Sequence, residues 1–350
     1  MAGEISDPIQ AGSLLSEGFR HSRGTTGVNG FKDYCQRRRP ILDRAIGQTL
    51  RALFRDLHVR PDQALSDTLR GGKMIRGSLV CLVNESLGGN PPSAVMRSVA
   101  VELIHGATLI HDDFVDQDRS RRGKPAAWTL AGARKAVLLG DVIFASAIEM
   151  MSGLSRDDGL AVSRAIARIA KGAFQEPVDP SELAFRLRSG TVPASFYDAI
   201  IDLKTGVLFG AACELGALAA GAGRDVRDAF YRYGLLIGEA YQIADDLQEI
   251  VRHLSGGAVD PRELAALAPA LVRFGSDPES SIASLLAGER SMLSPALSKS
   301  FEEVRWGMEQ EMARRLELAR REVAGLVPDS REGAMIQEAP RELIEMFNGV

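Results

Sequence analysis

The feature that most constrains the fold is a helical spacing of apolar residues along almost the whole chain. Apolar side chains recur every three or four residues in eight segments, near 40–57, 74–88, 93–115, 131–153, 160–174, 195–221, 226–252 and 301–325. Alternation with period two is nowhere long enough to predict a strand. Stretches such as Gly88-Gly89-Asn90-Pro91-Pro92 separate the segments, as expected of loops between helices. The sequence therefore predicts an all-α protein.

The two ends of this pattern suggest the domain organisation. Residues 1–30 are rich in Gly, Ser and Thr and have weak periodicity, so we predict a poorly ordered N-terminal extension. Residues 31–350 carry the helical pattern, and their length is compatible with a single all-helical domain.

Composition and charge exclude several classes of protein. The net charge of -4 gives no electrostatic support for nucleic-acid binding. The three cysteines, Cys35, Cys81 and Cys213, are far apart and show no metal-ligand spacing, which indicates a reducing, cytoplasmic location. The start of the chain lacks the pattern of a secretion signal. The most apolar stretch, Gly206–Gly223, contains Glu214, so we expect a buried core helix and no transmembrane segment.

Two acidic clusters lie within apolar helical segments. Asp112 and Asp116 share one helix face, and Asp245 and Glu249 share another, with Asp246 beside them. Carboxylates grouped among apolar residues require a cation, and an all-oxygen ligand set suits Mg²⁺. The alternative interpretation is that both clusters are solvated helix faces.

Basic residues provide a complementary anion-binding set. Lys73 and Arg76 follow a pair of glycines at a predicted helix start, where a phosphate can approach closely. Arg121 and Arg122 follow the first acidic cluster, and paired guanidinium groups bind phosphate oxygens well. Further candidates are Lys204-Thr205, which opens a predicted helix, and His105, which could equally be a core histidine. Together with the acidic clusters, they predict a site for a polyanion and divalent ions.

These residues resemble the motifs of the trans-isoprenyl diphosphate synthases, the polyprenyl synthetase family. The matching segments are Gly71-Gly72-Lys73 with Arg76, Glu102 through Asp116, Arg121-Arg122-Gly123-Lys124-Pro125, Leu139-Gly140-Asp141, Tyr197 through Lys204-Thr205, and Tyr241 through Asp246. They span roughly residues 35–252 in the family's order.

The resemblance implies a role for each matching residue. Asp112, Asp116 and Asp245 would bind magnesium ions on an allylic diphosphate, with Asp246 and Glu249 completing the second cluster. Contacts to the allylic substrate would come from Arg121, Lys204, Thr205 and Gln242. The diphosphate of isopentenyl diphosphate would bind to Lys73, Arg76, His105 and Arg122. The catalytic set would be Asp112, Asp116, Asp245 and Lys204.

The resemblance also implies a fold and a reaction. The fold would be an isoprenoid synthase bundle of roughly ten or more helices around a central apolar cavity, usually in a homodimer, and residues 31–350 would be its catalytic domain. The reaction would be a Mg²⁺-dependent, head-to-tail trans condensation of isopentenyl diphosphate with an allylic diphosphate. Ala107 and Thr108 lie one turn before Asp112, where a large side chain would stop chain growth. Both are small, so we expect products of C20 or longer.

The sequence also departs from the family's pattern. Met74, Gly77 and Glu249 replace the usual Arg, Pro and Asp, and the usual Gly-Lys segments after the second cluster are not visible. Arg252 and His253 are the nearby candidates to replace those lysines. Two alternatives therefore stay open: a terpene cyclase or unusual coupling enzyme on this fold, or a non-catalytic partner subunit.

Overall fold

The computed structural model describes residues 30–57, 69–70, 72–176, 182, 185–186, 189–190, 192–193, 195–255, 261–278, 280–282 and 295–347. The predicted N-terminal extension lies outside these residues except for Gly30, and so does Gly71 of the first motif.

The described residues form twelve α-helices, one π-helical turn and one β-hairpin. The α-helices are α2 (Phe31–Asp56), α4 (Ile75–Ser86), α5 (Pro91–Val115), α6 (Ala127–Ala131), α7 (Ala133–Leu154), α8 (Arg156–Gln175), α10 (Phe196–Ile201), α11 (Val207–Ala219), α12 (Arg224–Leu254), α13 (Pro261–Phe274), α15 (Pro295–Glu322) and α16 (Arg331–Phe347). The all-α prediction, with ten or more helices, is confirmed. The single-domain interpretation of residues 31–350 stays a prediction.

Each of the eight predicted segments corresponds to a helix, but local sequence patterns missed some boundaries. The predicted segment near 40–57 begins at Pro40, whereas α2 begins at Phe31 and contains Pro40. The Glu342 carboxylate of α16 accepts a hydrogen bond from the backbone N–H of Phe31 at 2.5 Å, so a residue more than 300 positions away caps the start of α2. No helix was predicted near α16 itself.

The hairpin was also absent from the prediction. Strands β1 (Ser120–Arg121) and β2 (Lys124–Pro125) pair in antiparallel fashion around Arg122 and Gly123. Both turn residues have positive φ, 54° and 73°, as a tight two-residue hairpin turn requires. Strands of two residues are too short to leave a period-two signal.

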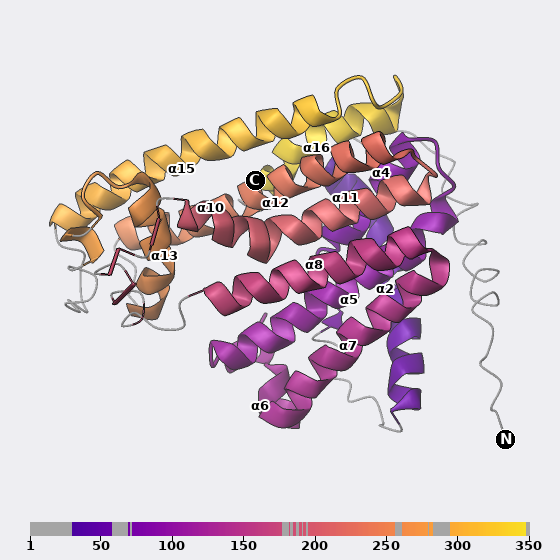
Figure 1. The fold of residues 1–350 in the computed structure, drawn as a ribbon, viewed down its shortest axis with the longest axis horizontal. Coiled ribbons are helices and arrows are strands. Elements are labelled where there is room, and N and C mark those ends of the chain that lie inside the picture. The colour runs from indigo at the N-terminus through magenta and orange to yellow at the C-terminus, as the bar shows by residue number, and fades with distance from the viewer. Residues whose placement is uncertain are drawn as a thin grey trace.

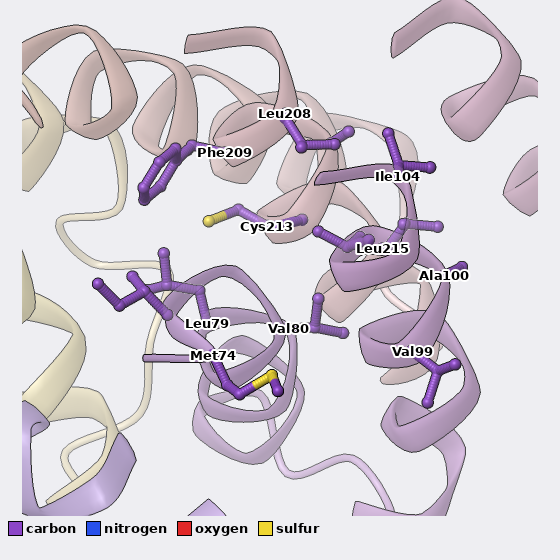
Figure 2. Close-up of a cluster of buried hydrophobic side chains, with 14 of the residues drawn as sticks. Met74, Leu79, Val80, Val99, Ala100, Ile104, Leu208, Phe209, Cys213 and Leu215 are labelled. Atoms are coloured by element: carbon purple, nitrogen blue, oxygen red, sulfur yellow. The ribbon is translucent and has the colours of Figure 1, made fainter. Parts of the chain in front are cut away.

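The main core is formed by helices that meet at the centre of the bundle. Figure 2 shows Leu79 and Val80 of α4, Val99, Ala100 and Ile104 of α5, and Leu208, Phe209, Cys213 and Leu215 of α11 grouped together. All of these residues are buried. The prediction that the apolar stretch after Gly206 is a core helix is therefore confirmed for α11.

A second core cluster lies where α12 meets α13 and α15. It contains Ile243, Ile250, Leu271, Phe301 and Met308. In Figure 1, α15 runs lengthwise along the top of the bundle, with α12 beneath it. This arrangement covers the end of α12 that carries the second acidic cluster.

Two of the described helices are long and apolar enough to cross a membrane by length and composition alone. They are α5 and α7. In the most apolar window of each helix, 67% is buried inside the protein for α5 and 28% for α7. The burial of α5 is that of a core helix.

Candidate active site

The first acidic cluster lies at the C-terminal end of α5, and its three aspartates have different environments. Asp113 is fully buried, and its carboxylate accepts a hydrogen bond from Arg121 of the hairpin at 2.5 Å. Asp112 is partly buried and Asp116 is exposed. The pKa of Asp112 is raised to about 6, mainly by burial and also by the charges of Asp116 and Glu176, while Lys204 opposes the rise. Asp112 and Asp116 thus face other charged groups, while Asp113 attaches the hairpin to α5.

Lys204 and Thr205 lie in a π-helical turn, Asp202–Gly206, between α10 and α11. The sequence predicted that they open a helix; instead they interrupt a longer helical run. Such turns are rare and are often found at functional sites. A Cβ atom on Gly172 of α8 would lie 2.7 Å from Leu203 Cβ and 3.3 Å from the Lys204 backbone nitrogen, so only glycine allows α8 to pack this closely on the turn.

Lys204 connects the two acidic clusters. Its ammonium group donates to both carboxylate oxygens of Glu176 at 2.9 Å. Its charge also lowers the pKa values of four aspartates, Asp112, Asp116, Asp245 and Asp246. Burial raises each of these pKa values more strongly than Lys204 lowers it. The charge of Lys204 therefore acts on both predicted acidic clusters, one on α5 and the other on α12.

The second cluster is held by a chain of hydrogen bonds. Thr205 donates to Gln242 at 2.7 Å, and Gln242 donates to one carboxylate oxygen of Asp246 at 3.0 Å. The hydroxyl of Tyr197 donates to the other oxygen at 2.7 Å. Burial raises the pKa of Asp246 to about 6. Since both oxygens of Asp246 are already hydrogen-bonded, exposed Asp245 is the better placed of the two to bind a metal ion.

A cavity of about 760 Å³ lies beside this cluster, between α12 and α15. Its lining residues are Ala244, Asp245, Leu247, Gln248, Glu249, Val251, Arg252, Glu309 and Met312. His253, by contrast, is buried, with its ring stacked on Phe301 at 6.5 Å between centroids. Arg252 and His253 are the candidates to replace the lysines of the family's Gly-Lys segments, and of these two residues only Arg252 lines the cavity.

The basic residues form a second region around His105. Burial lowers the pKa of His105, and the charges of Arg76, Arg122 and Arg121 lower it further. The Arg76 guanidinium lies 4.4 Å from the centre of the Phe209 ring, and burial lowers its pKa as well. Positive charges from three guanidinium groups thus act on one imidazole, and this environment favours a bound anion.

Lys73 has a different position from the other predicted anion ligands. Its side chain is exposed and donates to the carbonyl oxygen of Met346 at 3.2 Å, near the end of α16. A cation there also interacts favourably with the helix dipole. Arg122 lies beside the same glycine pair, because its guanidinium nitrogens would lie 3.5 Å from a Cβ atom on Gly72.

The two predicted chain-length residues differ in exposure. Ala107 is fully buried, whereas Thr108 is partly exposed and its hydroxyl donates to the carbonyl oxygen of His105 at 2.8 Å. Thr108 is thus the one that borders open space.

Sequence reasoning missed several residues of the site. Glu176 pairs with Lys204. Glu102 accepts a hydrogen bond from the backbone N–H of Gly77 at 2.7 Å, and its charge raises the pKa of Arg76 against the effect of burial. Glu102 lies within α5, and Glu176 directly follows the last residue of α8. Only the packing of those helices shows which cation each one faces.

The donor set fits magnesium on one condition. Among the residues that the structure describes, no three His, Cys, Asp or Glu side chains are close enough to hold a metal ion by themselves. Mg²⁺ usually takes one or two carboxylates and completes its shell with water and substrate phosphates. Asp112, Asp116 and Asp245 therefore suit an ion that is shared with a bound phosphate.

Comparison with known proteins gives a consistent result. The sequence model of the polyprenyl synthetase family matches residues 60–255. A geranylgeranyl diphosphate synthase from Methanosarcina mazei is 35% identical over 186 residues, which cover 51% of this chain and 55% of that protein. A (2E,6E)-farnesyl diphosphate synthase from Mycobacterium bovis is 38% identical over 176 residues, covering 50% of this chain and 48% of the relative. The chain thus spans about half the length of the curated relatives it matches.

Solved structures share the fold over most of the chain. A polyprenyl synthase from Caulobacter crescentus, complexed with calcium and isoprenyl diphosphate, has a TM-score of 0.64 and 26% identity, and covers 91% of this chain and 99% of its own. A decaprenyl diphosphate synthase from Rhodobacter capsulatus has a TM-score of 0.65 and 24% identity, with coverages of 87% and 98%.

Proposed function

Because the chain belongs to the polyprenyl synthetase family, we propose that it is a Mg²⁺-dependent prenyltransferase. It condenses isopentenyl diphosphate with an allylic diphosphate, head-to-tail and in trans, to give a polyprenyl diphosphate of C20 or longer. The observation that carries this proposal is that the charge of Lys204 acts on both acidic clusters. The charges of three guanidinium side chains act on His105 in a separate region. The two regions suit two diphosphates, one bound through metal ions and one bound directly.

The allylic diphosphate binds at the acidic clusters in this proposal. Asp112, Asp116 and Asp245 would hold Mg²⁺, which would supply positive charge to stabilise a departing pyrophosphate. Lys204 contributes a further positive charge to the same space, and Glu176 holds its ammonium group in place at 2.9 Å. Thr205 and Gln242 orient the second cluster through their hydrogen bonds.

The second diphosphate binds among Arg76, His105 and Arg122 in this proposal, and Arg76 lies in the first turn of α4. Neutral His105 donates one hydrogen bond, and the guanidinium groups supply the charge. The alkene of isopentenyl diphosphate attacks the allylic carbon as its carbon–oxygen bond breaks. A proton is then lost from the adduct to the departing pyrophosphate. The buried faces of α5 and α11 exclude water, which would otherwise capture the allylic cation.

The growing chain runs along α5 away from Asp112. Thr108 borders this path and is small, which supports a product of C20 or longer. We also propose that the protein is a cytoplasmic homodimer. The three buried free thiols among the described residues suit a reducing compartment.

One observation favours the alternative of a cyclase or an unusual coupling enzyme. The cavity beside the second cluster carries one cation, Arg252, against three carboxylates, Asp245, Glu249 and Glu309. Such a lining gives less support to a second diphosphate on that side than a lysine-rich segment would.

The test is a direct incubation of the purified chain with Mg²⁺, isopentenyl diphosphate and one allylic diphosphate at a time. Formation of longer diphosphates supports the proposal, and a chelator should abolish it. Hydrocarbons formed without consumption of isopentenyl diphosphate would favour the cyclase. No product from any pair would overturn the proposal and leave the partner-subunit alternative, which predicts an effect on the rate of a catalytic relative.

A further inference from the structure

Arg315 is a buried cation at the junction of three helices. It lies on α15, outside the residues 60–255 that match the family. Among the described residues it is the only buried arginine, with 6% of its surface exposed. Its guanidinium group pairs with Asp198 of α10 at 2.6 Å, with Glu311 of α15 at 2.8 Å, and with Glu239 of α12.

Two of these carboxylates adjoin the hydrogen bonds that hold the second acidic cluster. Asp198 follows Tyr197, whose hydroxyl donates to Asp246. Glu239 lies one turn of α12 before Gln242, which donates to the other oxygen of Asp246. The charge of Arg315 also acts on Tyr197, whose pKa burial raises and Arg315 lowers. Arg315 therefore links α10, which carries Tyr197, to α12, which carries both Gln242 and Asp246.

Glu239 also contacts the π-helical turn. A Cβ atom on Gly206 would lie 3.0 Å from Glu239 Cγ, so the Glu239 side chain packs directly on the last residue of the turn. That turn carries Lys204 and Thr205, and Thr205 donates to Gln242. A shift of Glu239 would therefore reach Asp246 by a second route, through the turn.

The energetics indicate a role in alignment. Burying a charge is costly, and well-packed apolar side chains could join the same helices at a similar or lower cost. Hydrogen-bonded ion pairs differ from apolar contacts because they fix direction and distance. A guanidinium group with three carboxylates around it therefore sets the relative position of α10, α12 and α15 more narrowly than apolar packing does.

We propose that Arg315 is a positioning residue for the proposed prenyl transfer. It holds Tyr197 and Gln242 at the distances that orient Asp246, and through Glu239 it supports the turn that presents Lys204. This inference rests on the proposed function for its consequence in turnover. The alignment of the magnesium–diphosphate site is tested separately, by binding.

The experiment uses the full chain with Arg315→Met, and with Arg314→Met as the matched control. Arg314 also pairs with Glu311, at 2.6 Å, but its side chain is exposed. Because Arg315→Met leaves buried Glu239 unpaired, the double variant Arg315→Met/Glu239→Gln removes the charge pair as a unit and serves if the single variant does not fold. The two readouts are kcat and the Mg²⁺-dependent affinity for inorganic pyrophosphate, measured by calorimetry.

We expect the Arg315 variants to lose about tenfold to a hundredfold in kcat and to bind magnesium pyrophosphate more weakly, with the KM for isopentenyl diphosphate nearly unchanged. Arg314→Met should behave like the unmodified chain. Combining Arg315→Met with Tyr197→Phe should cost little more than the worse single change, since both act on Asp246. Multiplied losses, or a loss equal to that of Arg314→Met, would overturn the inference. A chain that binds magnesium pyrophosphate but makes no product refutes the proposed function and leaves the binding test of Arg315 in force.

Discussion

Gly172 provides a sharp test of how the π-helical turn positions Lys204. An alanine Cβ there would lie 2.7 Å from Leu203 Cβ, 3.2 Å from the Leu203 carbonyl carbon and 3.3 Å from the Lys204 nitrogen. Carbon atoms in contact prefer about 3.5–4.0 Å, so Gly172→Ala must move the turn away from α8 by about 1 Å. Two of the three close atoms belong to the backbone, so a side-chain rotation cannot relieve the clash.

The expected effects on stability and on rate are different in size. Overpacking costs about 1–3 kcal/mol, and replacing a helical glycine by alanine returns about 1 kcal/mol, so the net loss in the free energy of unfolding should be about 0–2 kcal/mol. A displacement of about 1 Å at a reacting group can cost about a hundredfold in rate. We therefore expect Gly172→Ala to fold and to lose much more activity than stability.

The assay compares kcat with the thermal unfolding midpoint of each variant. Gly153→Ala in α7 is the matched control, because nothing lies within 4 Å of its added Cβ atom. It should keep full activity and should not lose stability. If Gly172→Ala retains normal kcat, or loses activity only in proportion to the folded fraction, the turn does not fix the position of Lys204 and the reasoning fails.

Three further predictions concern the metal ligands, the second anion site and the chain-length residues. Asp112→Asn should lower metal-dependent turnover by at least about a hundredfold, because a transition-state charge contact is lost. Asp118 is exposed, and Asp118→Asn should keep the normal rate. Equal rates in the two variants would refute the metal assignment. In steady-state kinetics, His105→Gln and Arg122→Gln should raise the KM for isopentenyl diphosphate more than the KM for the allylic substrate. Equal increases in the two KM values would contradict the division into two anion sites. Thr108→Phe should shorten the main product seen by chromatography of the dephosphorylated chains, and an unchanged product would show that another side chain stops growth.

The sequence by itself determined the fold class and the composition of the site. Helical spacing is a local property, so eight helical segments could be predicted without any contacts, and α11 could be assigned to the core from its apolar side chains. Arg76, His105 and Arg122 were candidates as a complementary anion-binding set, and the acidic clusters were candidates for a simpler reason. Charged groups within apolar helices require partners, whatever the tertiary arrangement.

Only the tertiary structure decided which of these groups face one another. Lys204 is far from Asp112 and Asp245 in sequence, and its shared space with both depends on a π-helical turn that leaves no periodic signal. The same is true of the Glu342 cap on α2 and of the guanidinium–carboxylate cluster around Arg315. Pairing energies between distant residues depend on distances that are set by the packing of whole helices. Spacing along the chain does not contain that information.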